Sequence, residues 1–136
     1  AAPVVISKLE LFDKDGRLLS ENLYWLAREP ADYRAMNAMP DARVTLAARV
    51  VENSKEREIA ATLTNTSSQP ALLVKLGLLD EAGERVLPAY WSENYLSLLP
   101  GETRTVSIRA PLSAAVPDSI TIRGWNVEAG KVQVMP

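Results

Sequence analysis

Four glutamates lie near one another along the second half of the chain, and paired carboxylates are the groups that hydrolyse glycosidic bonds. They are Glu81, Glu84, Glu93 and Glu102. Two carboxyl groups about 5 to 10 Å apart supply the acid and the base or nucleophile of that reaction. Each of these glutamates, however, lies in or beside a turn with Gly, Pro or Ser, where a carboxylate is normally solvated. We therefore predict that none of them is catalytic.

Other reactive side chains are scarce. The chain has no His, the commonest general base and zinc ligand, and no Cys, so it has neither thiolate chemistry nor disulfides. Lys75 stands in an apolar stretch, where we expect it on the outward face of a strand rather than buried as a nucleophile. The string from Asp13 to Gly16 lacks the further oxygen ligands of an EF-hand loop, so we interpret it as a turn. We expect no catalytic residue, no cofactor and no metal.

Aromatic side chains are better candidates for a binding role. Tyr and Trp can lay a flat apolar ring on the apolar face of a sugar and keep a polar group for hydrogen bonds. We select Tyr90, Trp91, Tyr95 and Trp25 as candidate contacts to carbohydrate or to another domain. For Trp25 and Trp125 we prefer packing in the core or against another domain. For Tyr90 and Trp91, in the loop 90–95, packing and binding both stay open.

The elements that position these residues are predicted to be strands. Apolar side chains recur at every second residue, as in strands with one buried face. Turn formers separate these stretches, notably Asp13–Gly16, Asn53–Glu56 and Asn65–Pro70; Asn65-Thr66-Ser67 also fits the N-glycosylation pattern, but we take the turn first. The predicted strands cover about 5–11, 18–26, 43–50, 58–63, 71–80, 85–87, 103–110, 119–127 with a bulge at Gly124-Trp125, and a last edge strand at 131–135.

One segment breaks the alternation. In residues 27–40, Pro30 is placed to begin a short helical turn and Pro40 to end it. Tyr33, Met36 and Met39 follow a three-residue spacing and can share one face of that turn. We prefer a cap over one end of a β-sandwich to a lid over a ligand, since apolar helical spacing usually means packing.

Length and composition limit the classes of protein. The chain has 136 residues with 15 basic and 17 acidic side chains, a net charge of -2. That length suits one domain, and the charge gives no basic surface for nucleic acid or an anionic membrane. No apolar run approaches the roughly 20 residues that cross a bilayer. We predict one all-β domain over 1–136, an immunoglobulin-like antiparallel β-sandwich of about seven to nine strands with a short helical or loop insertion at about 30–39.

Three stretches resemble one known family. RVLPAYWSENYLSLLPGE at 85–102, NLYWL at 22–26, and the segment from Asp32-Tyr33 to MNAMP at 36–40 are similar to the C-terminal immunoglobulin-like domain of family 2 glycoside hydrolases, of the exo-β-D-glucosaminidase and β-mannosidase type. The resemblance runs from about Leu9 to Val127. Met36 and Met39 stand where Leu is usual in the family, a change that conserves volume.

The resemblance implies a C-terminal fragment of a larger, secreted or periplasmic multidomain enzyme. Its parent would hydrolyse β-linked glucosaminyl or mannosyl ends by a retaining mechanism, with both catalytic glutamates on a separate (β/α)8 barrel. The fragment would be a noncatalytic accessory domain whose partners are that barrel and the neighbouring domains, with no nucleic acid or membrane partner. Two alternatives stay open: a carbohydrate-binding module that holds glycan with the loop 90–95, and a stand-alone adhesion-type immunoglobulin-like domain.

Overall fold

Strands make up most of the computed structural model, which describes residues 2–51 and 55–136. The all-β fold class expected from the alternating sequence is confirmed. Packing divides the chain into two units, Ala1–Met39 (unit 1) and Pro40–Pro136 (unit 2). The prediction that 1–136 forms one domain stays a prediction.

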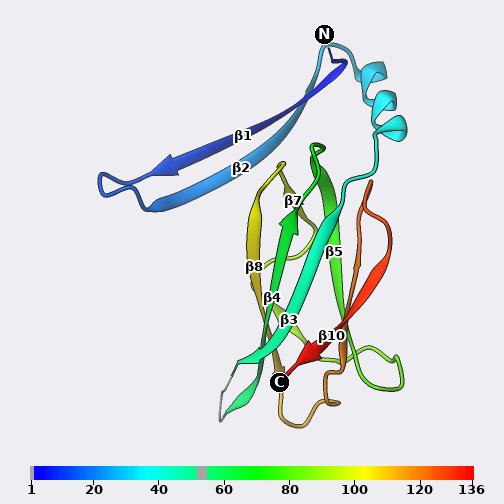
Figure 1. Ribbon diagram of the computed structural model, residues 1–136. Helices are drawn as coiled ribbons and strands as arrows, with labels where there is room; N and C mark the ends of the chain where they lie inside the picture. Colours follow the sequence, from blue (N-terminus) through cyan, green and yellow to red (C-terminus); the bar gives the residue numbers. More distant parts are fainter. Residues whose placement is uncertain (1, 52–54) are drawn as a thin grey trace. The chain divides into compact units, whose positions relative to one another are not determined.

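Unit 1 contains a long β-hairpin. Strand β1 (Val4–Phe12) pairs antiparallel with β2 (Leu18–Ala27), from Val4 opposite Ala27 onwards (Figure 1). The Asp13 carboxylate accepts hydrogen bonds from the backbone N–H groups of Asp15 and Arg17, both at 2.9 Å, and Gly16 supplies a φ of +80°. Glycine adopts this left-handed backbone conformation without strain. The predicted hairpin turn is confirmed.

The rest of unit 1 is a short 3-10 helix, η1 (Pro30–Ala38). Pro30 begins it, where the fixed φ of proline suits a first helical position and its missing N–H costs nothing. Met36 is buried, and the Tyr33 hydroxyl donates to the backbone carbonyl of Trp25 at 2.7 Å. The helical insertion predicted at about 30–39 is confirmed, while its role as a cap over a sandwich stays a prediction.

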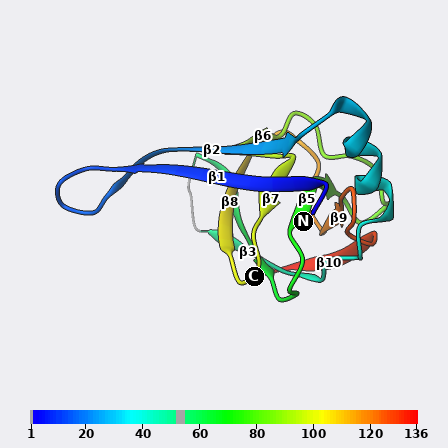
Figure 2. The same ribbon diagram turned by 90° about the horizontal axis from the view of Figure 1, so that it is seen from above.

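Unit 2 is built from one eight-stranded sheet of order β6-β8-β4-β3-β10-β9-β5-β7. All neighbours are antiparallel except β3 and β10, which run parallel through the pairs Val134–Ala48 and Met135–Arg49. The sheet is curled, and Figure 2 shows the strands of unit 2 arranged around a common interior. The strands are β3 (Val44–Val51), β4 (Glu56–Asn65), β5 (Ala71–Leu79), β6 (Tyr90–Trp91), β7 (Leu96–Leu98), β8 (Thr103–Pro111), β9 (Ser119–Arg123) and β10 (Gly130–Met135).

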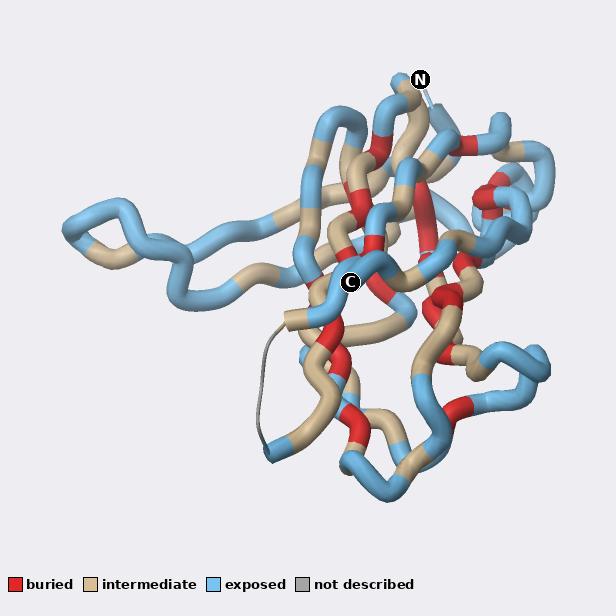
Figure 3. Tube along the Cα trace, turned by 60° about the horizontal axis from the view of Figure 1, so that its bottom comes forward, coloured by how far each residue is buried: buried red, intermediate tan, exposed pale blue. Residues whose placement is uncertain are grey.

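The core of unit 2 takes the residues that the alternation predicted. Buried positions concentrate on its strands, as the colouring of Figure 3 shows. The confirmed sets are Ile59, Ala61 and Leu63 on β4, Leu72, Val74, Leu76 and Leu78 on β5, and Val106, Ile108 and Ala110 on β8. Val50 is an exception: it is exposed, because it lies beyond the last pair that β3 makes with β10.

Three predicted elements differ from the structure in their position or bounds. The last strand is not an edge, because β10 lies between β9 and β3; a parallel pairing so far apart in sequence leaves no local signal. The strand predicted to reach 127 ends at Arg123, after which the Gly124 N–H turns back to the Val127 carbonyl at 3.1 Å. The turn predicted at Asn53–Glu56 lies mostly outside the described residues, and Glu56 already begins β4.

Candidate functional site

The aromatic loop, residues 90–95, connects β6 to β7 and carries three of the four candidate residues. Tyr90 and Tyr95 are 57% and 58% exposed. Trp91, the neighbour of Tyr90 on β6, is half-buried and packs against the core of unit 2. Adjacent residues of a strand point to opposite faces, so these two rings cannot form one flat platform. The role of all three as carbohydrate or interdomain contacts stays a prediction.

Asn94 joins the aromatic loop to strand β5 through hydrogen bonds of its side chain. Its Oδ1 accepts the Leu76 N–H at 2.8 Å, and its Nδ2 donates to the Leu76 carbonyl at 3.0 Å, so one amide replaces the backbone of a neighbouring strand. The same Oδ1 accepts the N–H of Tyr95 at 2.9 Å. Tyr95 follows with a φ of +55°, a left-handed conformation uncommon outside Gly and Asn. The loop is therefore held in place, and Tyr95 is displayed by it.

Lys75 lies over the exposed ring of Tyr95. Its Nζ is 5.4 Å from the ring centroid, within the range of a cation–π contact. Lys75 is on the outward face of β5, between the buried Val74 and Leu76, as the sequence predicted. One face of the most accessible tyrosine ring is thus occupied by a cation.

Arg104, on β8, binds the aromatic loop through an ion pair with Glu93. Its guanidinium contacts Glu93 at 3.1 Å and Glu102 at 2.8 Å, and all three side chains are at least two-thirds buried. The second oxygen of Glu102 accepts the Leu99 N–H at 2.9 Å. Charge-assisted hydrogen bonds of this length are stronger than neutral ones. Glu93 and Glu102 therefore have a structural explanation, as supports of the loop and of the turn that follows it.

The turn Leu99-Pro100-Gly101-Glu102 begins β8. Pro100 and Gly101 occupy its two central positions, with Gly101 at a φ of +77°, and the Glu102 N–H donates to the Leu99 carbonyl at 3.0 Å. Pro followed by Gly is the signature of a type II turn. The strand predicted at 103–110 follows this turn as β8.

Two buried asparagines, Asn65 and Asn126, have structural roles that the sequence patterns did not predict. Asn65 is fully buried, and its Nδ2 donates to the carbonyls of Gln69 at 2.7 Å and Leu98 at 3.0 Å. Asn126 accepts the Leu72 N–H at 3.0 Å and donates to the carbonyls of Pro40 and Pro70. Both amides satisfy backbone groups of strand ends and loops that are buried or partly buried. The glycosylation pattern at Asn65 thus falls on a side chain that holds the core together.

The two other tryptophans lie in different units. Trp25 is half-buried on β2, opposite Ile6. Trp125 follows β9 in unit 2 and is 52% exposed. Of the two packing roles predicted for it, the exposure excludes the core, and packing against another domain stays a prediction. The Trp125 N–H donates to the Leu72 carbonyl at 2.8 Å, which fixes the backbone while the ring is exposed.

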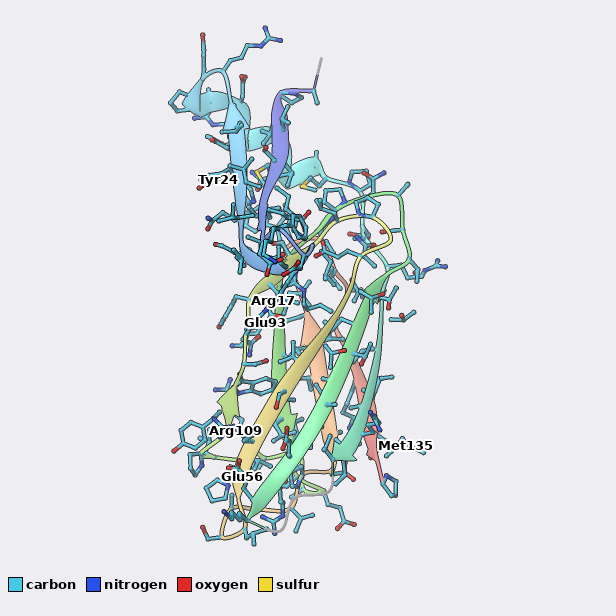
Figure 4. The ribbon with its side chains drawn as sticks, turned by 90° about the vertical axis from the view of Figure 1, so that its left-hand side faces the viewer. Arg17, Tyr24, Glu56, Glu93, Arg109 and Met135 are labelled. Atoms are coloured by element: carbon cyan, nitrogen blue, oxygen red, sulfur yellow. The ribbon has the colours of Figure 1, made fainter. Side chains whose placement is uncertain are left out.

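A further candidate surface lies on unit 1. The register of β1 and β2 places five large apolar side chains on one face, and all are 45% to 60% exposed. We call this the apolar hairpin face; its residues are Val5, Leu9, Leu11, Tyr24 and Leu26. Figure 4 shows Tyr24 projecting from β2. The opposite face has Lys8 bound to Glu10 and Glu21, both at 3.1 Å.

The described residues offer no obvious centre for chemistry. They contain no group of three or more Asp or Glu placed to hold a metal, and no helix long and apolar enough to cross a membrane. The turn glutamates Glu81 and Glu84 are exposed. Unit 2 is a curled, mostly antiparallel sheet around one core, and its loops are held by the side-chain amides of Asn65, Asn94 and Asn126. The class of protein is an immunoglobulin-like β-sandwich.

Within that class the chain belongs to the exo-β-D-glucosaminidase Ig-fold domain family, whose model matches residues 22–127. It is 32% identical to an exo-β-D-glucosaminidase of Amycolatopsis orientalis and 30% identical to one of Arthroderma benhamiae, in each case over 89% of this chain. The solved structure of the Amycolatopsis orientalis exo-chitosanase CsxA matches 97% of this chain with a TM-score of 0.85 and 29% identity.

The match covers a small part of each relative. The chain spans 14% and 15% of the length of the two curated relatives and 18% of the CsxA chain. A shorter match of 42 residues, 45% identical, links it to a mannosylglycoprotein endo-β-mannosidase of Lilium longiflorum. The resemblance to an accessory domain of the glucosaminidase type is confirmed, and the mannosidase resemblance is limited to 31% of the chain.

Proposed function

We propose that residues 1–136 form one noncatalytic accessory domain of a larger family 2 glycoside hydrolase, and that this domain packs against and stabilises the catalytic assembly. The observation that carries the proposal is the apolar hairpin face. The family match from 22 to 127 crosses the boundary between the two units at Met39, which supports treating them as one functional domain.

The hairpin needs a covering partner for energetic reasons. In the described residues β1 and β2 pair only with each other, and a two-stranded ribbon alone is at best marginally stable in water. Burying a Leu or Val side chain fully contributes about 1.5 to 3 kcal/mol. Four of the five side chains of the face are Leu or Val and about half of each is exposed, so covering that exposed area contributes several kcal/mol. Another domain of the same parent is the natural partner, because the relatives are several times longer than this chain.

The parent's activity follows from the relatives. We infer that it removes β-linked glucosaminyl residues from the ends of glycans by a retaining mechanism, with its catalytic residues on a separate (β/α)8 barrel. The glucosaminidase matches cover most of the chain, whereas the mannosidase match covers a third, so glucosamine is preferred to mannose. We infer a secreted or periplasmic location for the parent, and the barrel and adjoining domains as the partners of this one.

The test uses the full-length parent. Leu9→Asn with Leu26→Asn places two polar side chains on the apolar hairpin face, and we expect Tm to fall by several degrees with a loss of activity at elevated temperature. The control is Leu112→Asn with Val116→Asn, two exposed apolar residues of a unit 2 loop, for which Tm should stay within about one degree. An unchanged Tm in the hairpin variant, or in a parent lacking 1–136, would contradict the proposal.

A second candidate is carbohydrate binding by the aromatic loop. The observation in its favour is that Tyr90 and Tyr95 are both more than half exposed, since a ring must be accessible to stack on a sugar. Against it, Lys75 covers one face of Tyr95 and Trp91 points inward. A stand-alone adhesion domain has no specific observation in its favour, because membership of a glucosaminidase domain family supports attachment to an enzyme.

A further inference from the structure

A groove of about 500 Å³ opens on unit 2 beside β5 and β9. Its lining includes Lys75, Gly77, Arg85, Trp91, Thr121 and Arg123. Lys75 and Arg123 are paired directly across the two strands, and Gly77 is paired with Thr121. Paired residues of antiparallel strands share a face, so these four lie on the outer face of the sheet.

Positive charge concentrates in this groove. Lys75, Arg85 and Arg123 all line it, and no Asp or Glu is among its lining residues. A fourth cation, Lys131 on β10, is paired with Thr121 and so lies on the same face. In the described part of the chain none of these four side chains forms an ion pair, in contrast to Lys8, Arg104 and Arg109. The chain as a whole carries a net charge of -2, so the local excess is not a property of its composition.

The shape of the groove suits an acidic side chain. A Cβ at Gly77 would stand 2.7 Å from the Thr121 Oγ1. Glycine at this position therefore leaves space in the groove that a side chain would fill. The exposed residue Leu87 adds apolar surface to the lining. A Glu side chain has an aliphatic stem for such a surface and a carboxylate for the arginines, which bind carboxylates through two parallel hydrogen bonds.

We propose that this groove binds an acidic polypeptide segment, rich in Glu and Asp, from another domain of the parent chain. This proposal rests on the proposed function, because it assumes that the chain packs against other domains of a parent enzyme. It adds the chemistry of one contact, an acidic segment of such a domain. Four like charges on one face repel one another, and a carboxylate-bearing partner removes that cost. Polymers of glucosamine are cationic when their amines are protonated, so the same charges oppose such a glycan here.

The first experiment tests the groove on the 136-residue chain itself. Hexaglutamate is titrated while NMR shifts of the backbone amides are followed, with hexalysine and a neutral Gly-Ser hexapeptide as comparison peptides. We expect saturable shifts at Lys75, Thr121 and Arg123 with hexaglutamate alone, weakened by added salt. The variant Lys75→Glu with Arg123→Glu should weaken binding at least about tenfold.

The matched control is the variant Arg43→Glu with Arg49→Glu. Both residues are exposed; Arg43 directly precedes β3 and Arg49 lies on it. This variant should bind hexaglutamate as the unmodified chain does. Circular dichroism checks that each variant folds. Absence of hexaglutamate shifts at millimolar peptide, or an equal loss in the control, would overturn the proposal.

The second experiment separates this proposal from the previous one in the full-length parent. Lys75→Glu with Arg123→Glu should lower Tm, whereas the control at Arg43 and Arg49 should not. If only the hairpin variant lowers Tm, the groove proposal fails and the packing function stands. If only the groove variant does so, the apolar hairpin face is not a contact and the groove is.

Discussion

The side-chain amide of Asn94 forms hydrogen bonds with both backbone polar groups of Leu76, at 2.8 and 3.0 Å. Leu76 is buried in the middle of β5, and this amide serves as its strand neighbour where β7 does not reach. Asn94 is therefore one of the side chains that join the aromatic loop to the core, together with Trp91. Stability and the display of Tyr95 both depend on Asn94.

Replacement of Asn94 tests this joint. Asn94→Ala leaves the N–H and the carbonyl of Leu76 without these partners, and each unsatisfied buried group costs about 1 to 3 kcal/mol. We expect the free energy of unfolding to fall by about 2 to 4 kcal/mol, measured by urea denaturation of the 136-residue chain. Asn22→Ala removes an exposed amide on β2 and should change it by less than about 0.5 kcal/mol. Equal effects of the two variants would contradict this role.

Gly124 is expected to tolerate no side chain. A Cβ there would lie 2.9 Å from the Leu72 carbonyl oxygen and 3.0 Å from the Val127 Cβ, and backbone cannot move aside as a flexible side chain can. Gly124→Ala should destabilise unit 2 by about 2 kcal/mol, the usual range for an overpacked site. Gly130→Ala is the control, since its Cβ would meet Ile122 at an ordinary 3.4 Å. Thermal unfolding followed by circular dichroism distinguishes them.

Arg104 and Arg109 both form ion pairs on β8, but in different surroundings. The Arg104 side chain is 23% exposed between two carboxylates, whereas that of Arg109 is 55% exposed. Figure 4 shows Arg109 beside Glu56. We expect Arg104→Met to cost about 1 to 2 kcal/mol, because two partly buried carboxylates lose their partner. Arg109→Met should cost less than about 0.5 kcal/mol, as exposed pairs do. Urea titrations measure both, and the reverse order would refute the argument.

Sugar titration tests the aromatic loop. Chitosan and mannan oligomers are added to the 136-residue chain while Trp fluorescence and NMR shifts are followed. We expect no change at millimolar sugar, because Tyr90 and Trp91 point to opposite faces of β6 and Lys75 covers one face of Tyr95. Saturable shifts that disappear in Tyr90→Ala and Tyr95→Ala would instead establish carbohydrate binding.

Local patterns in the sequence predicted most of the strands. The period of two on β4, β5 and β8 placed their buried faces correctly, because alternation is a property of each strand alone. Gly16, Pro30 and the Pro100-Gly101 pair marked turns and a helix start for equally local reasons. The stretches 22–26 and 85–102 also identified the family, since they carry a recognisable order of side chains.

Tertiary structure alone decided the rest, and the reason is that it depends on contacts between distant residues. The parallel join of β10 to β3 made an expected edge strand an inner one. The exposure of Trp125, the inward packing of Trp91 and the burial of Asn65 depend on what surrounds each side chain. So do the charges of the groove: Lys75 and Arg123 are far apart in the sequence, and only the pairing of β5 with β9 brings them together.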